Sequence, residues 1–484
     1  MRSRIWMEKN HYPIMFSRLG ASLLLTGLVE QSGAALKDIS LALKQGTIEV
    51  KPKFVSIHTG LLSPKLATQA LGGFSRCLDQ GFAISVTFPS DTRFLPGLAY
   101  LEATILWSDG VEESLRLATT SVELLAPIDF NVPIGAETIG IALTTYNPNP
   151  TLFDRQINSI RRQSHRDWVC VISDDCSSPT FLAEVEVMLK GDPRFRLAIG
   201  KNNAGLYRNF ERAIALLPEA CRWIACADQD DEWSSDKLQV LITEGIRTQS
   251  PIIFSDMAIY SIGGQRLADT FWTFRRLEFQ SPAAIAIANT ATGMTMLFRS
   301  CILAVAMPFP ALPGLSYHDR WITLVGLTKG NLQYVDQKLV RYIQHGGNHT
   351  GVLKRPISAK ALLFQFVKCY AGVGLAALRP SWRGTIPDRL RLIEHWTNAE
   401  LLSLSLQIEV VQQRLPKEQW REDTWDQFKS ILSRPALILF QVPFRSLRDP
   451  YRRSMVMGLT LGTLSKSLIS VLLKCTSFLL RNPA

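Results

Sequence analysis

Three carboxylates stand within four residues at Asp228-Gln229-Asp230-Asp231, directly after an apolar run at 223–227. Two carboxylates that flank a single residue can hold one hard divalent cation, and the oxygens of a diphosphate can complete its coordination shell. Such a cation neutralises the charge that builds on a departing diphosphate. A short acidic pattern is by itself more typical of a solvated loop, here one that caps a helix beginning near 234–236.

A further acid, Asp319, lies far along the chain in His318-Asp319-Arg320-Trp321. A displacement reaction that releases a diphosphate needs a carboxylate that faces the attacking hydroxyl, opposite the leaving diphosphate. That carboxylate must come from a part of the chain separate from the acidic loop at 228–231. Taken alone, Asp319 is also typical of an acid in the first turn of a helix.

Strand-like and helical patterns alternate from Thr138 onward. The expected strands lie at 139–144, 168–173, 195–199 and 223–227, and the expected helices between them at about 152–163, 181–189 and 205–217. This alternation predicts βαβ units and a mostly parallel sheet covered on both faces. Ligands of such sheets bind beyond the carboxyl ends of the strands, which is where the polar residues of interest stand.

Eight short motifs occur through this region in a fixed order. They are IGIALTTYN at 139–147, ISDDCSS at 172–178, NAG at 203–205, DQDDEW at 228–233, IFSDM at 253–257, TGMTMLF at 292–298, YHDRWI at 317–322 and RYIQHGGNHTG at 341–351. The series resembles the inverting GT-A fold glycosyltransferases of family 2, and its later motifs resemble the bacterial rhamnosyltransferase-like branch. The resemblance covers about 138–351 and implies a GT-A (Rossmann-like) catalytic domain.

The resemblance implies a set of nucleotide-binding residues: Thr145, Tyr146, Asp175, Asn203, Gly205 and Asp228. Tyr146 would lie beside the base, and Asp175 would accept a hydrogen bond from the ring N–H of uracil or thymine. Asp174 would shape the loop. Gly205 would permit close approach of the backbone to the nucleotide.

The resemblance also implies a divalent metal, Mn²⁺ or Mg²⁺, with Asp230 as the direct ligand and Asp228 and His345 beside it. His345 lies in a glycine-containing loop that can close over the diphosphate, although a lone loop histidine is more often solvated. Asp319 matches the general base. Arg320 replaces a tryptophan that is frequent in relatives, which leaves the acceptor side less defined.

Other polar residues of the region have two readings each. Arg208 could face phosphate or solvent from its helix. Asn289 and the threonines of 292–295 could line the acceptor side, or satisfy one another inside the protein.

Length and composition restrict the classes of protein to which these motifs can belong. The chain has 484 residues, 46% hydrophobic and 20% charged, which excludes disordered, collagen-like and disulfide-scaffold classes. Eight cysteines without a C-x-x-C pair favour a reducing compartment. We expect no signal peptide, because the apolar run near Leu23–Leu28 is short and lies behind a charged opening that contains a histidine. We expect no membrane-spanning helix, because the uncharged stretch 279–298 is interrupted by proline and polar residues.

Four segments are expected along the chain: an N-terminal segment at 1–35, a sandwich-like β-rich domain at 36–130, the GT-A domain at 138–356 and a helical basic region at 357–484. An Asp109-Gly110 pair between two alternating runs predicts a hairpin in the β-rich domain. Residues 126–137, with two prolines, are typical of a linker.

The net charge of +11 resides in the C-terminal part of the chain, where 20 lysines and arginines and nine acids follow from Lys354. The pattern from Arg445 to Arg481 is that of a cationic amphipathic helix, which favours an anionic membrane surface as partner. The alternative is a terminal helix packed on its own domain. No motif indicates nucleic-acid binding.

Together these features predict an inverting glycosyltransferase. It would move a sugar, rhamnose first of all, from a UDP- or dTDP-sugar to a cell-surface polysaccharide or lipid-linked glycan, in the cytoplasm or at the inner face of the cytoplasmic membrane. The alternative is a non-catalytic scaffold that binds glycans or nucleotide sugars at the membrane. The intact acidic motif and Asp319 argue against it.

Overall fold

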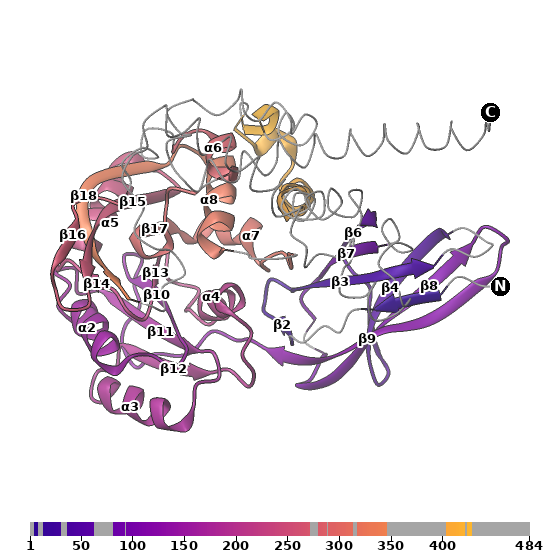
Figure 1. The fold of residues 1–484 in the computed structure, drawn as a ribbon, viewed down its shortest axis with the longest axis horizontal. Coiled ribbons are helices and arrows are strands. Elements are labelled where there is room, and N and C mark those ends of the chain that lie inside the picture. The colour runs from indigo at the N-terminus through magenta and orange to yellow at the C-terminus, as the bar shows by residue number, and fades with distance from the viewer. Residues whose placement is uncertain are drawn as a thin grey trace, which may run out of the picture.

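A computed structural model describes residues 4–7, 13–30, 36–61, 81–91, 93–271, 279–287, 289–312, 317–345, 403–421 and 424–427 (Figure 1). The predicted amphipathic helix at 445–481 and most of the predicted helical region lie outside these residues. Among the described helices, none has the length and apolar character that a membrane crossing requires.

Two antiparallel-rich sheets form the N-terminal part of the molecule. One has the order β1-β3-β7-β6, and the other has the order β2-β9-β8-β4-β5. In chain order the strands are β1 (Arg4–Met7), β2 (Ile14–Phe16), β3 (Ala21–Glu30), β4 (Leu36–Gln45), β5 (Ile48–Val50), β6 (Phe54–Leu61), β7 (Gly81–Phe88), β8 (Gly97–Trp107) and β9 (Glu112–Leu124). Apolar side chains from both sheets, such as Leu25 and Val86 on one and Leu43 and Ile105 on the other, share one core, so the sheets form a sandwich.

The β-sandwich begins earlier than the sequence patterns predict. Strands β1 to β3 lie within residues 4–30, where we expected a separate N-terminal segment, yet β2 pairs with β9 and β3 pairs with β7. The apolar run that contains Leu23 and Leu25 is therefore a buried strand. The predicted hairpin is present between β8 and β9, and Gly110 takes the left-handed φ of 83° that the turn requires.

The second part of the molecule is built on a nine-stranded mixed sheet with the order β12-β11-β10-β13-β17-β15-β18-β14, and β16 pairs with β15. Its strands are β10 (Ile139–Thr145), β11 (Trp168–Asp174), β12 (Phe195–Ile199), β13 (Trp223–Ala227), β14 (Glu232–Trp233), β15 (Ile252–Ser261), β16 (Arg266–Ala268), β17 (Met296–Arg299) and β18 (Gln333–Gln344). Strands β10 to β13 are parallel, and β17 runs antiparallel to β13 and β15. The predicted strands are confirmed to within one residue.

Helices cover both faces of this sheet, as predicted for buried parallel strands. They are α2 (Pro150–Arg161), α3 (Pro179–Leu189), α4 (Leu206–Ala215), α5 (Lys237–Thr248), α6 (Pro282–Ile287), α7 (Leu303–Ala306) and α8 (His318–Lys329). Successive residues of β10 point to opposite faces. Ala142 packs in a core with residues of α4 and α8, whereas Ile141 packs in a core with residues of α2 and α5.

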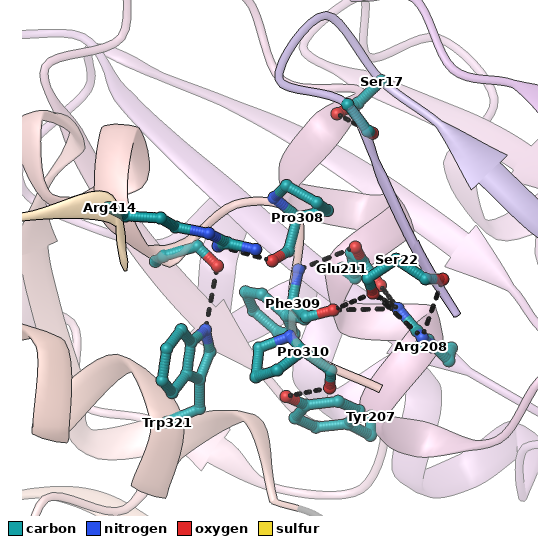
Figure 2. Close-up of polar contacts among 12 residues, drawn as sticks. Ser17, Ser22, Tyr207, Arg208, Glu211, Pro308, Phe309, Pro310, Trp321 and Arg414 are labelled. Atoms are coloured by element: carbon teal, nitrogen blue, oxygen red, sulfur yellow. Dashed lines mark hydrogen bonds and ion pairs between the residues drawn. The ribbon is translucent and has the colours of Figure 1, made fainter. Parts of the chain in front are cut away.

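The β-sandwich, the mixed sheet and a helical segment at 403–414 are packed together. Figure 2 shows Arg208 of α4 reaching Ser22 of β3 and the carbonyl of Phe309, while Arg414 donates to the carbonyls of Val305 and Pro308 at 2.9 and 2.7 Å. Leucine and valine side chains of 404–415 join the core on the α4 and α8 face. The three parts therefore share both polar and apolar contacts.

Candidate functional site

The carboxyl ends of β10 and β13 are joined by Gln229. Its Oε1 accepts hydrogen bonds from Thr145 Oγ1 at 3.0 Å and from the Tyr146 backbone N–H at 2.8 Å. The side chain between the two aspartates of the acidic loop thus holds that loop against the predicted nucleotide loop. Sequence reasoning passed over Gln229, although its place inside the acidic motif was a usable signal.

The loops after β10 and β11 are also tied to each other. The Asn147 N–H donates to Ser177 Oγ at 2.7 Å, and the Ser178 N–H donates to Asn147 Oδ1 at 3.0 Å. Asp174 accepts from the Ser177 N–H at 2.7 Å and from the Ser177 hydroxyl. Asp174 therefore shapes the loop, as the sequence predicts.

Asp175 is buried, and its two oxygens accept from the backbone N–H groups of Ala204 and Gly205, each at 2.8 Å. Burial raises the pKa of this carboxyl, while those hydrogen bonds and the Arg212 guanidinium oppose the rise. Each carboxylate oxygen has a second lone-pair site, so the predicted bond to a pyrimidine N–H stays compatible with these contacts. Its role toward a base stays a prediction.

The remaining predicted nucleotide residues surround the same strand ends. Tyr146 is 48% exposed and Asn203 is exposed, whereas Thr145 is buried. Gly205 has a φ of 82°, a conformation that favours glycine, and it immediately precedes α4. The exposed ring of Tyr146 is available to a planar partner.

The acidic loop lies in an environment that resists further negative charge. Burial raises the pKa of Asp228, and the charges of Asp230 and Asp319 add to the rise. Asp231 is buried and its Oδ1 accepts from the Ile343 N–H at 3.2 Å; burial and the two neighbouring aspartates raise its pKa well above the usual range. A cation held here would relieve this repulsion.

Asp230 meets His345, which follows directly on the end of β18. The His345 Nε2 lies 2.8 Å from Asp230 Oδ2, and both side chains are largely buried, 22% and 18% exposed. No group of three or more His, Cys, Asp or Glu side chains is arranged as a metal site within the described residues. One or two protein ligands, completed by diphosphate oxygens and water, is the usual arrangement for Mg²⁺, so these residues fit a cation that arrives with the donor.

Asp319 lies in the first turn of α8. Its Oδ1 accepts from the Arg320 N–H at 2.6 Å, its Oδ2 accepts from the Gly293 N–H at 3.3 Å, and Asn289 also hydrogen bonds to it. Burial raises its pKa, and its charge acts on Asp228. Asp319 and the acidic loop therefore lie within electrostatic reach, from two separate parts of the chain.

Two other polar residues that could have lined the site make contacts within the protein instead. Thr295 donates to the Thr292 carbonyl at 2.8 Å, which is internal satisfaction. Arg208 is mostly buried and bonds to Ser22, Glu211 and Phe309 at the junction with the β-sandwich (Figure 2).

Lys237 is a site neighbour that sequence reasoning missed. It is fully buried, with Nζ 3.2 Å from the centre of the Trp233 ring. Burial lowers its pKa well below the usual range, against the opposing charges of Asp231 and Asp228. Its place at the start of the helix that follows the acidic loop could have identified it from the sequence.

Comparison with known proteins identifies a family for one part of the chain. Residues 141–300 match the family model described as Glycosyl transferase family 2. The Escherichia coli K12 protein WcaA, named as a colanic acid biosynthesis glycosyl transferase, is 32% identical over 104 residues, 22% of this chain and 36% of that protein. WfgD of Escherichia coli, named as a UDP-Glc:alpha-D-GlcNAc-diphosphoundecaprenol beta-1,3-glucosyltransferase, is 26% identical over 142 residues, 29% of this chain and 54% of that protein.

The chain thus spans about a third to a half of the length of these two relatives. Among solved structures, S. aureus TarS 1–349 in complex with UDP-GlcNAc is similar over 68% of this chain and 91% of that chain, with 15% identity and a TM-score of 0.39. The family match covers β10 to β17, the strands that carry most of the site. Residues 141–300 of this chain are therefore a glycosyl transferase family 2 domain, and its fold is GT-A.

Proposed function

We propose that this chain is a glycosyltransferase that transfers one sugar, with inversion, from a UDP- or dTDP-sugar to a growing cell-surface glycan. The observation that carries the proposal is the placement of two carboxylate groups around one strand edge. Asp230 with His345 stands on one side, and Asp319 stands within reach of the same acidic loop. Rhamnose is the sugar we propose first, because the motifs at 253–351 resemble the rhamnosyltransferase-like branch.

A divalent cation belongs to this proposal. Asp230 and His345 would hold it, with the carboxylate of Asp228 nearby, and its chemistry would be to neutralise charge on the departing diphosphate. The raised pKa of Asp228 supports this proposal, because a bound cation would stabilise the ionised form of this carboxylate.

The proposed base is Asp319. Its carboxylate would take the proton of the acceptor hydroxyl while the acceptor oxygen bonds to the anomeric carbon and the nucleoside diphosphate leaves from the opposite face. The backbone N–H groups of Arg320 and Gly293 fix the orientation of its two oxygens. A raised pKa makes the carboxylate a stronger base than an exposed aspartate.

The acceptor is proposed by analogy. The two curated relatives carry names that refer to colanic acid biosynthesis and to a diphosphoundecaprenol-linked sugar, so a lipid-linked glycan is the acceptor class we propose. The surplus of basic residues after Lys354 supports contact of the C-terminal region with an anionic membrane surface. Sedimentation of the full chain with anionic vesicles, and not with zwitterionic vesicles, is the expected result.

Donor binding tests the proposal. UDP-, dTDP-, GDP- and CDP-sugars should be compared by calorimetry with Mg²⁺, with Mn²⁺ and with EDTA. We expect tight, metal-dependent binding of a uridine or thymidine sugar. Failure of every donor to bind under all conditions would contradict the proposal and favour a glycan-binding scaffold.

A further inference from the structure

Arg212 of α4 is a buried cation that lies between the β-sandwich and the loops of the candidate site. Its side chain is only 1% exposed, although arginine is rarely buried unless it is paired. It is one of the largest fully buried side chains of the described part of the chain. A buried charge is stable only with partners of opposite charge, and Arg212 has a carboxylate on each side.

The first partner belongs to the β-sandwich. Arg212 Nε lies 3.2 Å from Glu123 Oε1, and its Nη2 donates to Glu123 Oε2 at 3.2 Å. Glu123 stands near the end of β9 and is 17% exposed. Two parallel contacts to one carboxylate fix the plane of the guanidinium as well as its position.

The second partner belongs to the candidate donor site. Arg212 Nη1 lies 3.6 Å from Asp175 Oδ1, and the same carboxylate accepts the N–H groups of Ala204 and Gly205. Arg212 Nη1 also donates to Asn209 Oδ1 at 3.4 Å. The guanidinium thus stands behind the carboxylate that holds the loop at 203–205.

Space for this arrangement comes from Gly200. A Cβ at that position would lie 2.5 Å from Arg212 Nη1 and 3.0 Å from the Asp174 carbonyl oxygen. The Gly200 N–H meanwhile donates to that carbonyl at 2.8 Å. The Arg212 guanidinium and the Asp174 carbonyl therefore occupy the space that a side chain at position 200 would need.

We propose that Arg212 is a positioning residue through which Glu123 of the β-sandwich holds Asp175 and the 203–205 loop in the geometry that binds the donor nucleotide. The β-sandwich thereby contributes to donor affinity without touching the donor. The proposal rests on the proposed function, because the loop is taken as the nucleotide loop. It assigns residues 4–124 a role beyond their own stability.

Two variants separate this role from plain stability. Glu123→Gln keeps the size of the side chain and removes its charge, and Arg212→Met keeps much of the length of the side chain and removes its guanidinium. Glu112→Gln is the matched control, since it makes the same change at an exposed position on the same strand. Arg212→Lys restores the charge without the planar fork.

Amide hydrogen exchange and nucleotide binding are the two measurements. In Glu123→Gln we expect faster exchange at the Ala204 and Gly205 amides. We also expect a donor KM raised about 5- to 20-fold with kcat nearly unchanged, because the loop contributes to donor binding whereas the proposed base, Asp319, keeps its position. In an Arg212→Met background, Glu123→Gln should add nothing further, because the connection is already broken. Arg212→Lys should recover part of the affinity.

Three results would overturn the proposal. Unchanged amide exchange at 204–205 in Glu123→Gln would overturn the positioning role, and this result does not depend on which ligand the protein binds. Unchanged donor affinity in Glu123→Gln and Arg212→Met, with a wild type that binds donor, would overturn the positioning role alone. A wild type that binds no nucleoside diphosphate would overturn the proposed function and this inference together.

Discussion

The imidazole of His345 and the carboxylate of Asp230 meet at 2.8 Å, although 115 residues separate them along the chain. Strand β18 makes this possible, because it pairs in parallel with β15 and also pairs with β14, the short strand that follows the acidic loop. The contact brings the acidic loop at 228–231 together with the last motif of the domain, at 341–351. It gives His345 a partner that a solvated loop histidine would lack.

His345→Ala tests whether this contact belongs to a metal site. We expect the Mn²⁺ concentration needed for half-maximal activity to rise at least about tenfold, because one protein ligand is lost. The control is His165→Ala, a half-buried histidine just before the amino end of β11, which should leave the metal response unchanged. An identical metal response in both variants would remove His345 from the site.

Gln229→Ala tests the link between the acidic loop and the nucleotide loop. Loss of its bonds to Thr145 and to the Tyr146 N–H should weaken nucleotide binding several-fold, about 1 kcal/mol for the exchanged hydrogen bonds. Gln239→Ala on the exposed side of α5 is the matched control. Calorimetric titration with UDP and dTDP measures the effect, and equal affinities in the two variants would contradict it.

The pH dependence of turnover tests the base. Burial raises the pKa of Asp319, so this carboxyl is protonated over a wider acidic range than an exposed aspartate. The protonated form cannot accept the acceptor proton; activity is therefore full above the folded-state pKa and is lost as the pH falls through it. The acidic limb of the kcat/KM profile at saturating metal should lie above about pH 4, the usual aspartate range. A flat profile down to that value would contradict the assignment.

Gly245→Ala tests the packing of α5 on the sheet. A Cβ there would lie 2.5 Å from the Trp223 ring and 2.8 Å from Ile253, so the core must shift. We expect a loss of about 1–3 kcal/mol in the free energy of unfolding. Gly263→Ala, whose added Cβ has an ordinary 3.9 Å neighbour, is the control, and equal melting temperatures in the two variants would contradict the packing described.

The core of the GT-A domain could be predicted from the sequence because its signals are local. Each parallel strand is a short apolar run, and each helix carries its own periodicity, so β10 to β13 and the helices between them needed no knowledge of distant partners. The polar residues follow those strands directly. Thr145, Asp175 and Asp228 therefore gather at one edge once the strands pair in parallel.

What the sequence could not reveal depends on contacts between distant segments. Strand β3 pairs with β7, about 60 residues later, and its short apolar run alone did not distinguish a strand from other structures. The burial of Asp175 depends on the fold of the 203–205 loop. The position of Arg212 depends on Glu123, which lies in the β-sandwich.

The most direct test of the account is release of nucleoside diphosphate by wild type and Asp319→Asn, measured side by side with Mn²⁺ and with EDTA. The variant keeps the size of the side chain and removes the base. We expect wild-type turnover that requires the metal, and a loss of about 10²- to 10⁴-fold in the variant with donor affinity nearly unchanged. Full turnover by Asp319→Asn, while it still binds donor, would contradict the account.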